Sequence, residues 1–263
     1  MAAPFVFEVC VETLDGALAA ARGGADRLEL CAGLALGGLT PSQAAVELAV
    51  VRAGIPVVVL QRPRRGDFVW SPAEVELMER DVELAGGAGA RGVAVGALCA
   101  DGKLDLAVLE RLARRAQGLE LVHHRAFDHV EGPLTALDEL VALGFTRLLT
   151  SGQAPTAWTG AGLLRELVEA AAGRLTVMPG GGVRAHNLRA LQQATGASEF
   201  HFSAGRRVPA PAAPGAARAP MAAGVPPGDH ERDETCEATV RACINSLRPS
   251  GPARPAARGR ADA

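Results

Sequence analysis

The chain has 263 residues, of which 48% are hydrophobic and 3% aromatic, and its formal net charge is −2. A charge so close to zero argues against a nucleic-acid surface or an anchor on an anionic membrane, and the absence of tyrosine argues against base-stacking platforms. No apolar stretch is long enough to cross a bilayer. Five cysteines without disulfide-framework spacing indicate reduced thiols in a cytosolic protein.

Short apolar runs recur along the chain and alternate with amphipathic segments. The predicted strands are 5–10, 27–31, 56–62, 91–97, 119–125, 146–151, 175–179 and 199–203. The predicted helices are 14–22, 43–53, 72–86, 104–116, 133–143, 161–172 and 184–195, with a closing helix within 232–247. Such alternation favours parallel strands joined by right-handed crossovers.

Eight such units indicate a single-domain α/β protein of the TIM type, a closed (β/α)8 barrel over residues 1–247. The alternative is an open, doubly wound sheet, but no G-x-G-x-x-G motif follows a strand, and no nucleotide cofactor is expected. Residues 205–231 are rich in Pro, Ala and Gly and are predicted to be a flexible loop inserted before the last helix. Residues 248–263 are predicted to be a disordered tail.

Two predicted strands end in the same unusual way, with a glutamate followed two residues later by a cysteine. These are Glu8 and Cys10 in "FEVC", and Glu29 and Cys31 in "RLELC". Because side chains alternate along a strand, each glutamate shares a face with its cysteine. If those faces point into the barrel, the two thiols are close enough to share a ligand.

The residues alone leave three interpretations of the thiols open. They can bind a soft metal such as Cu(I), in a linear geometry, or Zn. They can be small buried hydrophobic residues, or they can form a disulfide under oxidation. The glutamates have two interpretations. They form either a buried ion-pair network with nearby cations or an acid/base cluster, in which Glu8, Glu29, His124 and His201 are the candidates for proton transfer.

The active sites of TIM-type barrels lie where the strands enter their following loops. At those positions this chain carries Arg62, Arg125, Ser151 and Ser203, together with the triglycine Gly180, Gly181 and Gly182 of "MPGGGV". A glycine-rich turn that opens onto a helix exposes backbone N–H groups to an anion. The alternative is a tight turn that needs glycine for conformational reasons. These residues are the predicted substrate- or anion-binding set.

Several motifs together resemble the CutC copper homeostasis family. They are "EVCVET", "GGADRLELCAGLALGGLTPS", "RPRRGDFVWSPAEVELM", "HRAFD", "LTSGQAP", "VMPGGGV" and "EFHFSAGR", and they span residues 7 to 206 in order. The chain departs from the family pattern at Arg65, where the family favours glycine, at His123, where it favours phenylalanine, and at Gly205, which separates Ala204 from Arg206.

The resemblance implies a TIM-type barrel that is a homo-oligomer, dimeric or tetrameric, and is cytosolic, with a nuclear location in eukaryotes. It implies a Cu(I) site at Cys10 and Cys31. It also implies a polar barrel mouth formed by Glu8, Glu29, Arg62, His124, Arg125, Asp128 and His201.

Two functions are therefore hypotheses for this chain. The first is a copper homeostasis protein that binds Cu(I) through the two thiols and buffers or delivers it. The second is a barrel enzyme of unknown reaction that acts on a small phosphorylated or carboxylated metabolite. The expected partner is accordingly a copper ion or a small anion.

Overall fold

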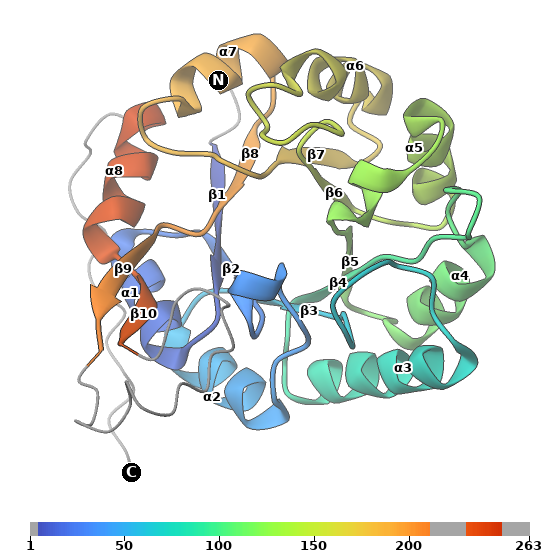
Figure 1. Ribbon diagram of the computed structural model, residues 1–263, viewed down its shortest axis with the longest axis horizontal. Coiled ribbons are helices and arrows are strands. Elements are labelled where there is room, and N and C mark those ends of the chain that lie inside the picture. The colour runs from blue at the N-terminus through green and yellow to red at the C-terminus, as the bar shows by residue number, and fades with distance from the viewer. Residues whose placement is uncertain (1–4, 211–229, 249–263) are drawn as a thin grey trace.

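The computed structural model describes residues 5–210 and 230–248, and within them eight parallel strands form a ring surrounded by helices (Figure 1). The strands are β1 (Val6–Val11), β2 (Arg27–Leu30), β3 (Val57–Leu60), β4 (Gly92–Val95), β5 (Glu120–His123), β6 (Arg147–Thr150), β7 (Thr176–Pro179) and β8 (Glu199–Phe202). The helices are α1 (Leu14–Gly23), α2 (Gln43–Ala53), α3 (Pro72–Gly87), α4 (Leu106–Arg115), α5 (Pro133–Ala142), α6 (Ala161–Ala171), α7 (Leu188–Thr195) and α8 (Glu237–Leu247). Short 3₁₀ turns lie at η1 (Leu34–Leu36) and η2 (Arg125–His129).

The strand order around the sheet is β7-β6-β5-β4-β3-β2-β1-β8, and every pairing in it is parallel. The end strands β7 and β8 lie side by side, so that the ring is nearly closed (Figure 1). The predicted (β/α)8 barrel is therefore confirmed. The carboxyl ends of all eight strands meet at one rim of the barrel, which we call the barrel mouth.

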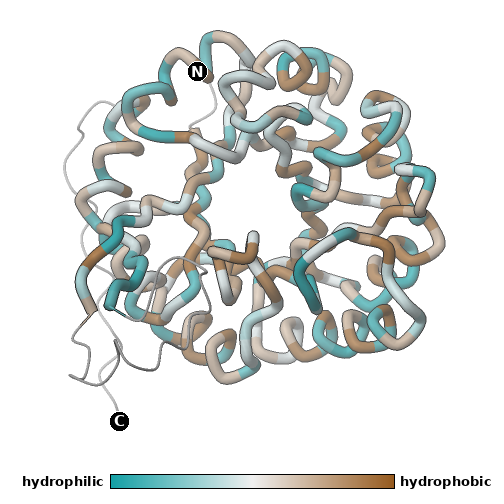
Figure 2. The backbone as a smooth tube through the Cα atoms, viewed as in Figure 1, coloured by the Kyte–Doolittle hydropathy of each residue, from teal (hydrophilic) through white to brown (hydrophobic). Residues whose placement is uncertain are grey.

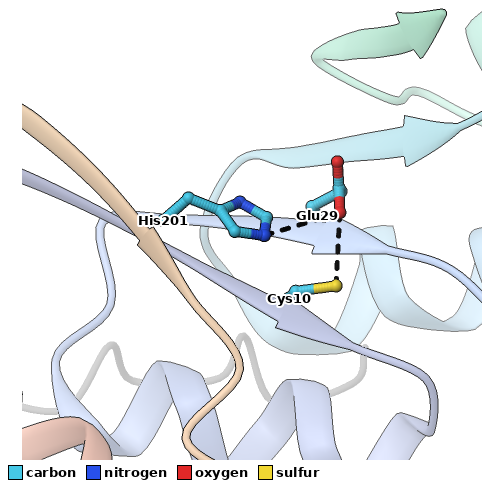
Figure 3. A group of neighbouring side chains, drawn as sticks. All are labelled: Cys10, Glu29 and His201. Carbon is cyan, nitrogen blue, oxygen red and sulfur yellow. Dashed lines mark hydrogen bonds and ion pairs between the residues drawn. The ribbon is translucent and has the colours of Figure 1, made fainter. Parts of the chain in front are cut away.

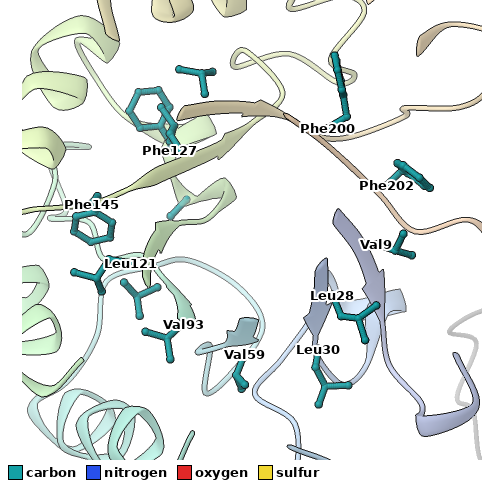
Figure 4. Close-up of a cluster of buried hydrophobic side chains, with 14 of the residues drawn as sticks. Val9, Leu28, Leu30, Val59, Val93, Leu121, Phe127, Phe145, Phe200 and Phe202 are labelled. Carbon is teal, nitrogen blue, oxygen red and sulfur yellow. The ribbon is translucent and has the colours of Figure 1, made fainter. Parts of the chain in front are cut away.

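The main apolar core lies between the strands and the outer helices. Outward-facing strand residues such as Val9, Leu28, Leu30, Val59 and Phe200 are buried there (Figure 4). A smaller cluster fills the barrel interior and consists of Cys10, Cys31, Val58, Leu60, Ala94, Val122, Leu149 and Met178. Figure 2 shows the same alternation as apolar positions that recur along strands and helices between polar ones. Alternation along each strand thus divides the side chains between two cores.

Local signals in the sequence fix most helix boundaries. The side chains of Thr13, Ser42, Ser71 and Asp105 each accept a backbone N–H in the first turn of a helix. At the other end, Gly24 closes α1 in the left-handed conformation with a φ of 97°. None of the helices in the described ranges is both long and apolar enough to cross a bilayer.

Helix α7 begins at Leu188, four residues later than predicted. The backbone N–H of Arg184 donates to Oδ1 of Asn187, and Asn187 Nδ2 donates to the carbonyl of Gly182. These bonds hold the segment before α7 in a turn rather than a helix. The triglycine therefore does not open directly onto a helix N-terminus, and the prediction that the triglycine opens onto a helix is wrong.

The segment predicted as a flexible loop over 205–231 contains ordered structure at both of its ends. Strand β9 (Gly205–Pro209) pairs antiparallel with β10 (Glu231–Thr235). Opposite charges face each other across the pair, as in the Arg207–Asp233 ion pair, and such pairs stabilise a two-stranded ribbon. The last helix accordingly begins at Glu237 rather than near 232. The remainder of the predicted loop and nearly all of the predicted tail lie outside the described residues.

Candidate functional site

Cys10, Glu29 and His201 converge at the barrel mouth from three adjacent strands (Figure 3). Cys10 of β1 is in register with Glu29 of β2, and His201 of β8 is in register with Glu8 of β1. The Cys10 thiol donates to Glu29 Oε2 over 3.2 Å, and His201 Nε2 lies 3.8 Å from the same oxygen. One ligand atom from each of the three residues lies within 4.8 Å of the others, so that they can share one metal ion.

The two thiols of the strand-end pattern lie next to each other. The Sγ atoms of Cys10 and Cys31 are 3.7 Å apart, and both side chains are buried in the barrel interior. The hydrogen bond with Cys31, burial and the nearby Glu29 together raise the pKa of Cys10 well above its ordinary 9.0. The Cys10 thiol is therefore protonated at neutral pH, and it must lose a proton to become a metal ligand.

Glu8 lies beneath this cluster in a network of buried charges. Its carboxylate accepts hydrogen bonds from Arg27 Nε at 2.5 Å and pairs with His201 Nδ1 at 2.8 Å. Arg27 also pairs with Glu199 at 2.8 Å. Burial alone raises the pKa of Glu8, but Arg27 and His201 outweigh it and lower that pKa from 4.5 to about 2. Glu8 is therefore a fixed negative charge, which supports the ion-pair interpretation for this glutamate and not the proton-transfer role predicted for it.

The Glu8 carboxylate orients the imidazole of His201, because it occupies Nδ1 and leaves Nε2 directed towards Glu29 (Figure 3). A carboxylate in this position is a common support for a histidine that binds a metal or transfers a proton. Burial lowers the pKa of His201, but Glu29 and Glu8 outweigh it and raise that pKa above 6.5. Burial, assisted by the charge of Glu8, raises the pKa of Glu29 above 4.5. Glu29 and His201 thus form a carboxyl–imidazole pair suited to proton exchange.

A cavity of about 270 Å³ opens above the cluster. Nine of the residues proposed from the sequence line it, namely Cys10, Glu29, Arg62, His124, Arg125, Gly181, Gly182, His201 and Ser203. The other five proposed residues do not line it: Glu8, Cys31, Asp128, Ser151 and Gly180. Their predicted roles are therefore indirect or depend on a rearrangement of the mouth.

Arg62 and His124 line the same cavity as Cys10. Arg62 is only 8% exposed, and its Nη atoms donate to the carbonyls of Leu36, Gly38 and Gly66. His124 is 4% exposed, and its Nδ1 accepts the backbone N–H of Ala126. Burial and the charges of His123 and Arg62 place the pKa of His124 well below 6.5. His124 is therefore neutral at pH 7, and its proton-transfer role remains a prediction.

The glycine at position 96 is required by this packing. A Cβ atom on Gly96 would lie 2.6 Å from Nδ1 of His124, far closer than van der Waals contact allows. The end of β4 therefore leaves room for the imidazole at the end of β5.

Asp128 and Ser151 organise the loops at the ends of β5 and β6. The Asp128 carboxylate accepts from Arg125 Nε at 2.7 Å, from Thr150 Oγ1 at 2.5 Å and from Ser151 N at 2.9 Å. Arg125 Nη2 in turn donates to Ser151 Oγ. These contacts hold Arg125 at the cavity wall, where the guanidinium is still half-exposed.

Gly181 and Gly182 bring the end of β7 against Arg125. Gly181 has a φ of 94°, in the left-handed region, and a Cβ atom there would lie 3.5 Å from Arg125 Cζ. The turn interpretation of the triglycine therefore has direct support. The anion-binding interpretation stays a prediction, with the cavity beside Gly181, Gly182 and Ser203 as its place.

The donor set suits a soft or borderline metal. Metal–thiolate bonds are about 2.3 Å long, so two sulfurs 3.7 Å apart can bind one ion. Because this separation is shorter than twice the bond length, an ion that bound both sulfurs in this arrangement would hold them at a bent angle rather than in the linear geometry considered from the sequence. A bent pair leaves room for a third ligand, and imidazole nitrogen is a donor that copper and zinc accept.

Sequence reasoning missed three residues of this region. Arg27 shares the inward face of β2 with Glu29, and the alternation in "RLELC" was the signal that could have revealed it. Phe68 and Arg184 also line the cavity, but they come from loops, where no periodicity indicates direction.

A (β/α)8 barrel that carries thiols, carboxylates and imidazoles at the carboxyl ends of its strands defines a class of protein whose ligand site lies at the barrel mouth. The model of the CutC family matches residues 5–206, and the chain belongs to this family. It is 46% identical over 200 residues to the human copper homeostasis protein cutC homolog, a match that covers 76% of this chain and 73% of the human protein.

Two further relatives also belong to the CutC family by their names. A CutC family protein of Agrobacterium fabrum is 46% identical over 200 residues, which cover 76% of this chain and 79% of that protein. The solved structure of CutC from Streptococcus agalactiae superposes with a TM-score of 0.73 at 35% identity and covers 76% of this chain and 98% of that one. The family resemblance drawn from the motifs is therefore confirmed.

Proposed function

We propose that the protein acts in copper homeostasis by binding Cu(I) through Cys10 and Cys31 at the barrel mouth and buffering or delivering it. The observation that carries this proposal is the 3.7 Å separation of the two Sγ atoms. Thiolates are the ligands that Cu(I) prefers. His201 Nε2, oriented by Glu8, lies within 4.8 Å of the Cys10 sulfur, but Cys31 is not part of that cluster, so His201 becomes a third donor only if its side chain or Cys31 moves as the ion binds.

Glu29 has a defined part in this proposal. Cys10 must lose its proton as the ion binds, and its thiol already donates to the Glu29 carboxylate. Burial raises the pKa of that carboxyl group, which makes it a better proton acceptor than an exposed glutamate. Glu29 is therefore the first acceptor of the thiol proton, and it passes that proton to solvent once the positive ion lies beside it, so that binding releases a proton.

The test is the anaerobic affinity for Cu(I), measured by competition with a chromophoric chelator. We expect about one Cu(I) per chain in the wild type and loss of this site in the Cys10→Ser/Cys31→Ser double variant. Cys99→Ser is the matched control, because Cys99 is exposed and lies in another loop. An unchanged affinity in the double variant would contradict the proposal.

A second candidate function is a barrel enzyme that acts on a small phosphorylated or carboxylated metabolite. It is favoured by the carboxyl–imidazole pair of Glu29 and His201, which opens on a cavity also lined by Arg62, Arg125 and Arg184. A Cu(I) site formed by Cys10 and Cys31 does not require these three arginines. A thermal-shift screen against a metabolite library tests it, since a ligand that binds the folded state raises the melting temperature. A screen without any stabilising anion would remove this candidate.

The resemblance also supports a cytosolic location, with a nuclear one in eukaryotes, and a homo-oligomeric state. The location and the oligomeric state are proposed from the family resemblance, and the geometry of the site does not bear on them. Sedimentation of the purified full-length chain distinguishes a monomer from the dimer or tetramer proposed here.

A further inference from the structure

Arg62 carries a buried positive charge that no carboxylate of the described residues balances. Its guanidinium has five N–H donors, of which three meet the carbonyls of Leu36, Gly38 and Gly66. Two remain, and one of them, Nε–H, is buried without a partner in the described part of the chain. Burial lowers the pKa of Arg62, and the positive charge of the nearby Arg64 lowers it further.

His124 presents a second unused donor to the same cavity. Because its Nδ1 accepts the Ala126 N–H, the proton of the neutral ring must reside on Nε2. That Nε2–H is buried, and within residues 5–210 and 230–248 it has no acceptor. A buried donor without a partner lowers the stability of the folded protein. Two such donors, from residues that line the same cavity, therefore favour acceptor atoms that the described residues do not supply.

Phe68 covers both donors. Its ring centroid lies 5.1 Å from Arg62 Cζ and 5.4 Å from the centre of the His124 ring, and it also lines the cavity. Phe68 belongs to the loop between β3 and α3. Both donors line the cavity together with Phe68, and a shift of this one loop side chain would widen the access to them without any change in the strands.

We propose that the mouth cavity binds a small organic anion whose carboxylate or phosphate oxygens accept hydrogen bonds from Arg62 and His124 once Phe68 moves aside. This inference deepens the second candidate function and rests on it. A water molecule can accept from one donor, but it leaves the charge of Arg62 unbalanced, and an unbalanced buried charge is destabilising. An anion satisfies the donors and the charge together.

The subsite lies in the same cavity as Glu29 and His201, so that these two residues can exchange protons with a bound ligand. With its anionic group at Arg62 and His124, a small molecule in a cavity of about 270 Å³ has its other end near Glu29 and His201. Arg62 and His124 thus position the anion in the cavity that Glu29 and His201 also line, and this carboxyl–imidazole pair can exchange protons with it.

The test uses the full chain with inorganic phosphate, malonate and glycerol 3-phosphate at matched ionic strength, and with glycerol as the neutral probe. We expect at least one anion to raise the melting temperature, whereas glycerol does not. If the phosphates raise the melting temperature and malonate does not, the ligand carries a phosphate. If only malonate raises it, the ligand carries a carboxylate. Failure of all three anions to bind overturns the inference.

Variants locate the binding. In Arg62→Met the dissociation constant of the binding anion rises at least tenfold, and in His124→Asn it rises several-fold, while Arg62→Lys retains part of the affinity. Arg65→Met is the matched control, because Arg65 is an exposed arginine of the same loop. If Arg62→Met does not fold, the anion affinity of His124→Asn tests whether the anion binds at this subsite. Anion binding that is equal in all variants overturns the subsite but leaves the second candidate function intact.

Movement of Phe68 has its own readout. Its ring packs edge-on against Trp70, with centroids 6.2 Å apart, and the chain has only two tryptophans. In a Trp158→Phe background, anion binding should change the fluorescence of Trp70 in parallel with the calorimetric titration. Cu(I) affinity is measured on the same Arg62→Met protein. Loss of anion binding with retained Cu(I) binding separates this inference from the copper proposal.

Discussion

At the scale of single residues, the protonation state of Cys10 controls the copper proposal. Its pKa lies well above 9.0, so Cu(I) must displace a proton at any physiological pH. We expect the apparent Cu(I) affinity to rise between pH 6 and 8 by about tenfold per pH unit for each proton released. The measurement is the same anaerobic chelator competition, repeated across pH with the chelator calibrated at each point. An affinity that does not vary with pH would be inconsistent with ligation by Cys10.

Glu8 is the residue whose charge most affects stability. Its pKa of about 2 in the folded state is below the ordinary 4.5. The stability that ionised Glu8 contributes is therefore fully present above about pH 4.5 and is lost as the pH falls through 2. Glu8→Gln should lower the free energy of unfolding at pH 7 by about 3 kcal/mol, because it breaks a buried ion pair.

Urea unfolding of the wild type and of Glu8→Gln between pH 3 and 7 tests this. The difference between the two proteins should shrink as the pH falls, since only the wild type loses the Glu8 contribution. The exposed Glu166→Gln serves as the control and should stay within about 0.5 kcal/mol of the wild type. A constant difference across pH would show that Glu8 is not ionised in the folded state.

At the scale of elements, the start of α3 connects helix capping to the barrel mouth. Ser71 Oγ accepts from the backbone N–H of Glu74, and the Glu74 carboxylate accepts from the N–H of Ser71. Glu74 also pairs with Arg64 of the loop that carries Phe68. Ser71→Ala should therefore lower the free energy of unfolding by about 1 kcal/mol.

The comparison for Ser71→Ala is Glu76→Ala, an exposed position on the same helix that should change the free energy of unfolding by less than about 0.5 kcal/mol. Both are measured by urea unfolding at pH 7. Equal effects of the two substitutions would mean that the capping box does not stabilise α3.

At the scale of the whole molecule, a chain of ion pairs joins strands that the backbone ladders do not. The sheet order begins at β7 and ends at β8, and among the described residues no backbone ladder pairs these two strands. Arg147 of β6 pairs with Glu199 of β8 at 2.8 Å, across β7, and also with Glu120 of β5. Both members of the Arg147–Glu199 pair are largely buried, with side-chain exposures of 16% and 11%.

Arg147→Met should lower the free energy of unfolding by about 3 kcal/mol, because it leaves the buried carboxylate of Glu199 with fewer partners. Arg91→Met is the matched control. Arg91 pairs with the same Glu120, but its side chain is 63% exposed, and the effect should stay below about 1 kcal/mol. A double-mutant cycle with Glu199→Gln isolates the pair. Equal costs for the two arginine variants would argue against closure through Arg147.

Much of the molecule could be predicted from the sequence because it is encoded locally. Period-2 apolar runs located all eight strands, and residues such as Ser71 and Gly24 marked helix ends, since these signals act over a few residues. The strand-end pattern also placed Glu8 on the same face as Cys10 and Glu29 on the same face as Cys31, because alternation along a strand is geometric, whereas the inward direction of both faces came from the structure.

Other features depended on tertiary contacts. The pairing of β9 with β10 and the late start of α7 follow from contacts that periodicity does not report. Arg27, Phe68 and Arg184 reach the site through barrel curvature and loop paths. The sequence by itself therefore determined the family, the barrel and the candidate residues, because these follow from local pattern and motif order. Only the tertiary structure decided the 3.7 Å between the thiols, the neutral state of His124 and the unbalanced charge of Arg62, because each depends on burial among residues distant in the chain.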